Sequence, residues 1–154
     1  MPRGASSTMP KPAPLPPLRK QDYEALSEFR HQLRRFLRFS EDAAQSEGLT
    51  PQQYLLMLHV KGSPGRDWAT VGELAERLQT VHHAVVALVS RCEAAGLVRR
   101  QPSEADRRQV EVHLCELGEQ CLERLAGRHR AELQSLSGVF QVAHISAFND
   151  GQAG

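Results

Sequence analysis

The segment that most constrains this chain is the point where a helical pattern ends in glycine and turns into an arginine-bearing hairpin. The helical pattern stops at Gly96, and glycine commonly ends helices because it accepts a left-handed backbone. Two strand-like runs follow, at residues 97–101 and 109–114, and a polar tip separates them. In the second run apolar and polar residues alternate, which is the period of a half-buried strand. The apolar residues expected to share one face are Val110, Val112 and Leu114.

The tip of this hairpin carries positive charge. Arg107 and Arg108 lie at the tip, and Arg99 and Arg100 lie on the first strand. The guanidinium group is planar and permanently charged, so it suits a place beside phosphates or in a minor groove. We therefore interpret the hairpin as the wing of a winged helix-turn-helix, with Arg107 and Arg108 contacting DNA. Because Arg99 and Arg100 alternate in facing, only one of them is expected to reach a phosphate.

Two short helices joined by a tight turn are predicted before the hairpin. Thr70 and Glu73 have the spacing of a capping box, which begins a helix over about 71–78. A turn at 79–80 leads into a second helix over about 81–95. This order is the geometry of a helix-turn-helix. The apolar stripe predicted to face the core of the second helix is Val81, Val85, Leu88, Val89 and Cys92.

The start of the second helix is where a helix-turn-helix meets base edges. A neutral imidazole can donate or accept a hydrogen bond, so His82 and His83 suit contact with a base or a phosphate. Val86 and Ala87 suit contact with thymine methyl groups. The alternative for each is ordinary: an exposed polar side chain with no partner, or an apolar one that packs. With the turn included, the residues predicted to contact DNA here are Thr80, His82, His83, Val86 and Ala87.

Longer helical patterns flank this unit on both sides. Apolar residues recur at helical spacing over 21–47, and a helix of that length exceeds what a small core needs, so part of it is expected to meet another subunit. A shorter helix is predicted over 51–61, where Thr50 and Gln53 have the spacing of a capping box. A long helix is predicted over 116–135, with Gly138 breaking it before a short helix over 139–148. The expected fold class is therefore mainly α with a small β-hairpin wing (α+β).

The two ends of the chain differ from its middle. Residues 1–19 contain six prolines and have little to bury, which predicts a disordered tail. Residues 20–148 are expected to form a single domain, in which about 50–114 is the winged lobe. Residues 149–154 are expected to fray.

Overall composition limits the function without deciding it. The formal net charge is only +1, which is weak evidence against nucleic-acid binding, although a local patch suffices because affinity depends on contacts to phosphates. No run approaches the roughly 20 apolar residues of a membrane span, and the first residues lack the apolar core of a signal peptide. Three cysteines without close pairing favour a reducing cytoplasm.

Four segments, taken in order, resemble the MarR family of bacterial transcription regulators. They are Val71–Leu78, Leu88–Val98, Asp106–Arg108 and Leu114–Gly118. The resemblance covers about residues 21–148 in element order and is sharpest over 70–118. It implies a homodimer built from helices over 20–47 and 115–148, with two winged lobes reading a pseudo-palindromic operator in duplex DNA. Members are often repressors released by small, frequently aromatic or phenolic, ligands, and some sense oxidants instead.

The resemblance also assigns roles at the wing tip, and the chain departs from the family elsewhere. It implies that Asp106 orients a guanidinium and fixes the tip, while Arg108 enters the minor groove. Cys115 stands where the family usually has a threonine that caps the next helix, and Cys92 stands where leucine is usual. The recognition helix begins with His82 rather than with the serine, threonine or arginine common in the family. The base contacts of other members therefore do not carry over to this helix.

An effector cavity between dimer helices and lobe is a further implication of the resemblance. Aromatic and methionine side chains at helical spacing are more often plain core, and that alternative stays open. The residues we take as candidate lining are Phe36, Tyr54, Met57 and Trp68.

The cysteines leave a second regulatory hypothesis open. Cys92 and Cys121 lie on apolar stripes, where cysteine usually acts as a small hydrophobe, whereas Cys115 would lie at a helix N-terminus, where a thiolate is favoured. A thiol-based oxidant sensor is therefore one alternative, and a winged-helix module that binds protein rather than DNA is another. No metal, cofactor or catalytic activity is expected, because the sequence has no recognised zinc spacing, phosphate loop or catalytic constellation.

Overall fold

In the computed structural model, residues 11, 14 and 16–135 are described. Within them the chain is mainly helical and carries one small antiparallel sheet, so the expected fold class is confirmed. Most of the expected N-terminal tail, the break at Gly138, the short helix over 139–148 and the frayed end lie outside the described residues. The elements are α1 (Lys20–Ser46), α2 (Pro51–Lys61), β1 (Trp68–Thr70), α3 (Val71–Leu78), α4 (His82–Ala94), β2 (Val98–Pro102), β3 (Val110–Leu114) and α5 (Glu116–Ser135).

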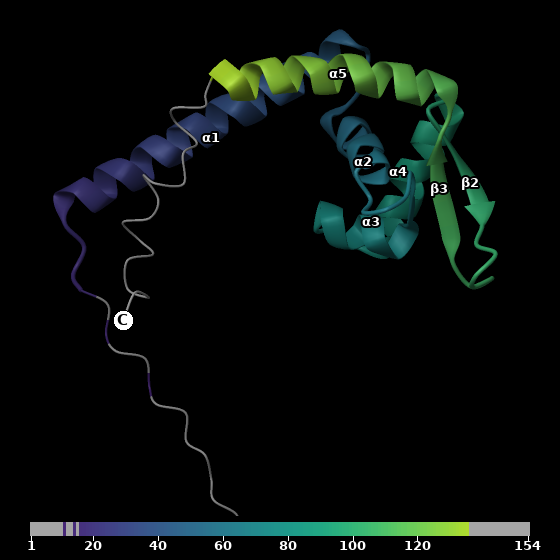
Figure 1. The fold of residues 1–154 in the computed structure, drawn as a ribbon, viewed down its shortest axis with the longest axis horizontal. Coiled ribbons are helices and arrows are strands. Elements are labelled where there is room, and N and C mark those ends of the chain that lie inside the picture. Colours follow the sequence, from purple (N-terminus) through teal and green to yellow (C-terminus); the bar gives the residue numbers. More distant parts are fainter. Residues whose placement is uncertain (1–10, 12–13, 15, 136–154) are drawn as a thin grey trace, which may run out of the picture.

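The two long helices and the winged unit occupy different parts of the molecule (Figure 1). Helix α5 packs along the C-terminal part of α1, where Arg124 of α5 pairs with Glu47 just beyond the end of α1 (Nη2–Oε2, 3.0 Å). Helices α2, α3 and α4 and the sheet form a lobe on one side of this pair. The N-terminal half of α1 projects beyond that lobe, which leaves much of its surface without cover from the lobe.

Two capping boxes begin helices where the sequence predicts them. The hydroxyl of Thr50 accepts a hydrogen bond from the backbone N–H of Gln53 (3.2 Å), and the Gln53 side chain accepts one from Thr50 (2.9 Å). Thr70 and Glu73 repeat the arrangement at the start of α3, with distances of 3.2 and 3.1 Å. Each pair satisfies two backbone donors that a helix start leaves free, which fixes where α2 and α3 begin.

The sheet contains a strand that the sequence pattern did not predict. Strand β1 pairs with β3 in antiparallel fashion, with Ala69 opposite Val112, and the strand order is β1-β3-β2. β1 has only three residues, which is too short for a period-2 pattern to be recognised. Because β1 makes β3 the central strand, Val112 is fully buried and even Glu111 is nearly so.

Two residues expected in the core are exposed. Val81, placed on the inner stripe of the second helix, is 54% exposed because α4 begins one residue later and Val81 is only its N-cap. Val110, placed on the inner face of β3, is 38% exposed because it pairs with Pro102 at the far end of the wing. The other four residues of the predicted α4 stripe are buried as expected: Val85, Leu88, Val89 and Cys92.

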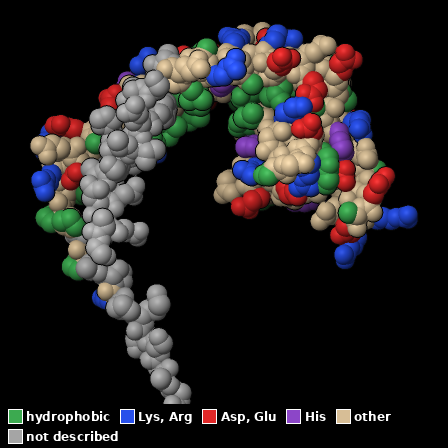
Figure 2. All heavy atoms as spheres, in the orientation of Figure 1, with side chains coloured by type: hydrophobic (Ala, Val, Ile, Leu, Met, Phe, Trp, Pro, Cys, Tyr) green, Lys and Arg blue, Asp and Glu red, His purple; other side chains and the backbone are tan. Residues whose placement is uncertain are grey.

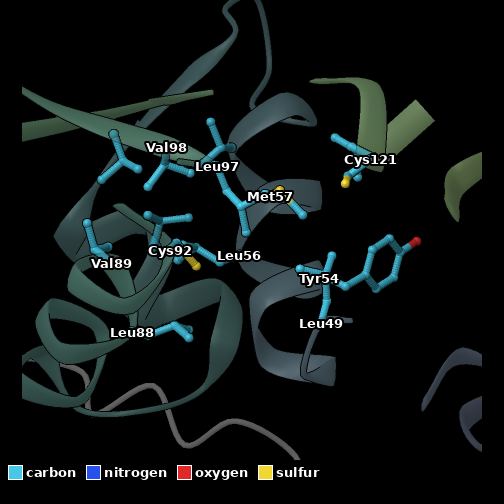
Figure 3. Close-up of a cluster of buried hydrophobic side chains, with 14 of the residues drawn as sticks. Leu49, Tyr54, Leu56, Met57, Leu88, Val89, Cys92, Leu97, Val98 and Cys121 are labelled. Atoms are coloured by element: carbon cyan, nitrogen blue, oxygen red, sulfur yellow. The ribbon is translucent and has the colours of Figure 1, made fainter. Parts of the chain in front are cut away.

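The core lies where α2 meets α4 and the base of the sheet (Figure 3). Leu56 and Met57 of α2, Val89 and Cys92 of α4, and Val98 of β2 belong to one buried cluster, in which Leu56 lies beside Cys92. All five side chains are almost completely inaccessible to solvent. This packing buries one face of α4 in the lobe, so the opposite face of α4 is presented outward.

Candidate nucleic-acid interface

The outward face of α4 carries the residues that the sequence singled out. His82 and His83 lie in the first turn and are exposed, and Val86 and Ala87 are exposed one turn later. No side chain caps the start of α4, so its first backbone N–H groups remain available to an acceptor. Thr80 is also exposed, and its backbone N–H closes α3 by donating to Ala75 (3.0 Å).

A tight turn sets the angle between α3 and α4. Gln79 ends α3 in the left-handed region, with φ 52° and ψ 48°. Its side-chain amide donates to the carbonyl of Glu76 (2.6 Å), which ties the turn back onto α3. The turn allows α4 to leave in a new direction after only three residues, as a helix-turn-helix requires.

The wing tip is a compact turn built on Asp106. One oxygen of its carboxylate, Oδ1, accepts from the backbone N–H of Arg108 (3.0 Å) and from the Arg108 guanidinium Nε (3.2 Å). The hydroxyl of Ser103 accepts from the Asp106 backbone (3.3 Å), and Gln109 N–H donates to the Asp106 carbonyl (2.9 Å). The Arg108 side chain is nevertheless 92% exposed, so Asp106 orients this guanidinium without shielding it.

Ser103 is a structural member of this tip that the sequence analysis missed. It is buried although it lies in a polar stretch, and its backbone N–H donates to the carbonyl of Gln109 (3.1 Å) across the turn. The only signal available was a serine three residues before an aspartate, which is a common spacing in turns.

A hollow of about 330 Å³ separates α4 from the wing. We call it the α4–wing hollow; its lining residues are Thr70, Val71, Gly72, His82, Val86, Arg100, Arg108, Gln109 and Val110. It brings together His82, Val86 and Arg108 from the predicted DNA-contacting set. Thr80, His83, Ala87 and Arg107 are exposed but do not line it. Positive side chains project from the wing tip in the space-filling view (Figure 2).

The two arginines of β2 have different surroundings. Arg99 is exposed and donates to the side chain of Gln101 (Nη1–Oε1, 2.6 Å). Arg100 is half-buried and bonds to α4 through Glu93 (Nη1–Oε1, 3.0 Å). Of the pair, therefore, Arg99 is the more accessible to a phosphate.

A second and larger hollow lies between α1, α2 and α5, with a volume of about 670 Å³. We call it the α1–α2–α5 hollow, and its walls are mostly apolar. Phe36 and Tyr54 line it, as the effector-cavity hypothesis requires. Met57 does not line it, because it is fully buried in the core. Trp68 lies elsewhere, on β1, where its ring stacks with His113 (6.1 Å between centroids) under the guanidinium of Arg66 (3.9 Å).

His129 of α5 is a wall residue of this hollow that the sequence analysis left unassigned. Its ring stacks on Tyr54, with centroids 4.7 Å apart and an interplanar angle of 16°. Nδ1 lies 2.6 Å from the carbonyl oxygen of Leu125 and therefore carries the proton, and Nε2 lies 2.8 Å from the hydroxyl of Ser40. Burial raises the pKa of the Tyr54 phenol, so this side chain stays neutral.

The three cysteines are free and occupy unlike surroundings. Cys92 is buried, and burial raises the pKa of its thiol to about 11. Cys121 is buried beside the guanidinium of Arg124 (Sγ–Nη2, 3.3 Å), and Cys115 is half-buried. In the part of the chain that the structure describes, no three histidine, cysteine, aspartate or glutamate side chains cluster as metal ligands would. No helix of that part combines the length and apolar character that crossing a membrane demands.

Helix α3, a tight turn, helix α4 and the β2–β3 hairpin follow one another in the order that defines a winged helix-turn-helix protein. Residues 47–109 match the MarR family. The chain is 30% identical over 112 residues to the HTH-type transcriptional repressor MdtR of Bacillus subtilis (strain 168), covering 69% of this chain and 70% of that protein. The chain therefore belongs to the MarR family and is a transcription regulator.

Solved structures agree with this fold. AbsC, a MarR family transcriptional regulator from Streptomyces coelicolor, superposes with a TM-score of 0.70 at 23% identity, covering 88% of this chain and 92% of that one. A mutant of MepR from S. aureus, solved bound to an oligodeoxyribonucleotide, superposes with a TM-score of 0.58 at 18% identity, covering 83% and 91%.

Proposed function

We propose that this regulator binds a pseudo-palindromic operator in duplex DNA as a homodimer, represses transcription there, and is released by a small aromatic ligand. The observation that carries the DNA-binding part is the α4–wing hollow, which His82 and Val86 border on one side and Arg108 on the other. A recognition helix in a major groove would leave the wing beside the neighbouring backbone or minor groove. Backbone N–H groups at the start of α4 and the tip arginines then supply donors to phosphates.

Exposed apolar side chains on the long helices support the homodimer. Tyr23, Leu26 and Leu37 of α1 and Leu133 of α5 are each 44% exposed or more. Their burial against a second copy would remove apolar surface from water and stabilise the pair. The part of α1 that projects beyond the lobe gives such a partner room to pack.

The α1–α2–α5 hollow supports relief by a ligand. Its volume of about 670 Å³ falls within the range of small-molecule sites, and its wall holds Tyr54, His129 and Phe36, which offer aromatic faces. It lies between the long helices and α2 of the lobe, so a ligand there would favour one angle between lobe and dimer over another. That angle sets the spacing of the two recognition helices on DNA.

DNA binding is tested by fluorescence anisotropy with a labelled duplex from upstream of the protein's own coding region. We expect specific binding, and we expect the logarithm of the association constant to fall linearly with the logarithm of the salt concentration, with a slope of several units. A scrambled duplex of the same composition is the control. If selection from a random pool of duplexes also yields none that the protein binds, the DNA-binding proposal is wrong.

Release by a ligand is tested with a panel of small aromatic acids and phenols added to the repressor–DNA complex. Ala126→Leu narrows the hollow and should abolish release while leaving DNA affinity unchanged. Ala131→Leu adds the same side chain at an exposed position of α5 that does not line the hollow, so it should respond like the wild type. Equal response of both variants would place the effector elsewhere.

A further inference from the structure

Arg100 differs from the other arginines of the wing because α4 holds its side chain. Its Nη1 donates to Glu93 Oε1 (3.0 Å), and its Nη2 donates both to the carbonyl oxygen of Val86 (3.0 Å) and to the hydroxyl of Ser90 (2.7 Å). Its backbone N–H donates to the second Glu93 oxygen (3.0 Å). Four hydrogen bonds therefore join one residue of β2 to three residues of α4.

The bonded atoms lie on the recognition helix itself. Val86 presents its side chain toward the α4–wing hollow and its carbonyl oxygen to Arg100. The Ser90 hydroxyl donates to that same carbonyl (3.0 Å) while it accepts from Arg100, so its single donor is used at this junction. The junction thus adjoins the surface predicted to read bases, because Arg100 lines the α4–wing hollow together with His82 and Val86.

The wing lacks any other comparable polar connection to α4 among the described residues. Beyond Arg100, β1 pairs with β3 only at Thr70 opposite Glu111, and the hairpin then continues past Pro102 and Val110 without a third strand. The direction of the hairpin, and therefore the place of Arg108 at its tip, depends on how β2 leaves the lobe. Glu93 accepts from the Arg100 guanidinium with one oxygen and from its backbone N–H with the other, and such a charge-assisted contact fixes an orientation as well as adding energy.

We propose that Arg100 is a positioning residue, which holds the wing at a set angle to the recognition helix through Glu93, Val86 and Ser90 and so strengthens DNA binding without touching DNA. This inference rests on the proposed DNA-binding function. Holding the wing in place before DNA arrives removes part of the ordering cost that binding would otherwise include. Lysine cannot replace arginine here, because a single ammonium cannot contact Glu93, the Val86 carbonyl and Ser90 in one plane.

The competing role, a direct phosphate contact by Arg100, makes the opposite prediction for its partner Glu93. Glu93→Ala removes a negative charge near DNA, so it should preserve or strengthen binding if Arg100 contacts phosphate. If Arg100 positions the wing, Glu93→Ala should weaken binding. Glu104→Ala removes an equal charge from an exposed wing residue with no contact to Arg100, and it serves as the matched control.

The experiment measures the affinity of full-length variants for the duplex that the wild type selects from a random pool, at several salt concentrations. We expect Arg100→Ala, Arg100→Lys and Glu93→Ala each to weaken DNA binding by about tenfold, with a salt slope equal to that of the wild type. The double variant Arg100→Ala/Glu93→Ala should bind no more weakly than either single variant, because both changes break the same contact. In these backgrounds Arg108→Ala should cost much less than in the wild type, because the wing tip is already misplaced. Hydroxyl-radical footprinting should show lost protection at the wing position alone.

Other outcomes overturn the inference. Tight binding by Glu93→Ala, together with a salt slope reduced by about one for each Arg100→Ala half-site, would make Arg100 a phosphate ligand. Full additivity with Arg108→Ala would show that Arg100 does not act through the wing. If the wild type selects no duplex at all, the DNA-binding proposal fails. If the wild type binds and the variants bind equally well, only the proposed role of Arg100 is refuted. Because Glu93 is exposed on a helix, Glu93→Ala keeps the test valid even if Arg100→Ala lowers the melting temperature.

Discussion

The α-carbon of Gly118, in the first turn of α5, lies so close to the carbonyl oxygen of Leu97 that no side chain fits between them. Leu97 joins three elements at this point: its N–H donates to Cys92 at the end of α4 (2.9 Å), and its carbonyl accepts from Cys115 just before α5 (2.9 Å). The start of α5 is therefore seated directly on the base of the wing. This contact links the helix expected to dimerise with the lobe expected to bind DNA.

Gly118→Ala should lower the free energy of unfolding by about 1–3 kcal/mol, because the added methyl group meets backbone that cannot rotate away. Gly127→Ala is the matched control on the same helix. Its Cβ would meet no atom within 4 Å, so the better helix propensity of alanine should stabilise the protein by about 1 kcal/mol. Chemical denaturation of both variants checks the pair. Equal stability would show that α5 does not dock on Leu97.

Cysteine reactivity tests the alternative of a thiol-based oxidant sensor. Only the thiolate reacts, and burial raises the pKa of Cys92 to about 11, so Cys92 should be protonated and unreactive at pH 8. Iodoacetamide labelling followed by mass spectrometry should modify half-buried Cys115 well before Cys92 in the folded protein. In denaturant both should react alike. Rapid labelling of Cys92 in the native state would contradict the buried placement and reopen the sensing hypothesis at that residue.

The features predicted correctly from sequence are those set by local interactions. Thr50 and Thr70 begin helices through contacts three residues away, so the capping pattern alone located both starts. Val81 and Val110 were wrongly predicted to be buried, because each lies at the end of its element. The apolar pattern continues to these positions, but the packed core ends before them. Strand β1 was not predicted, because three residues are too few to show the alternation of apolar and polar side chains that indicates a strand.

Contacts between distant residues could not be read from the sequence in the same way. His129 meets Ser40 across 89 positions of sequence, and nothing near either residue indicates the partner. The hydrogen bond between Arg100 and Ser90 joins β2 to α4. The alternation of side chains along β2 therefore predicted only that Arg99 and Arg100 face opposite sides, and not which partner Arg100 has. The candidate DNA-contacting residues could be proposed because an exposed helix face and a hairpin tip are both visible as patterns.

The protein should be a dimer in solution. The chain has a mass of 17.1 kDa, so multi-angle light scattering at micromolar concentration should give about twice that value. Leu37→Glu places a charge on the exposed apolar surface of α1 and should shift the mass toward one chain without unfolding the lobe. Leu117→Glu changes an equally exposed leucine near the wing base and is the control. A wild-type mass near that of one chain would contradict the homodimer.

Arg108→Ala should weaken operator binding by about 1–3 kcal/mol per half-site, because a guanidinium in a narrow groove or on a base edge would be lost. The melting temperature should change little, since the side chain is 92% exposed. Arg30→Ala removes the same charge from an exposed position of α1 and should bind almost as the wild type does. If the two variants bind equally well with equal stability, the wing does not contact DNA.

His83→Ala separates base reading by the recognition helix from mere proximity to DNA. His83 lies in the first turn of α4, exposed and away from the buried stripe that includes Val85 and Leu88. If its imidazole reads a base, the loss should fall on one operator position, because base contacts specify while phosphate contacts only position the protein. If it bonds a phosphate, all sequences should weaken alike. Affinities measured over a set of single-base operator variants distinguish these two profiles, with Arg91→Ala, an exposed change nearer the end of α4, as the control. An unchanged profile and affinity would show that His83 takes no part, and that sequence recognition depends on the wing and on the shape of the DNA.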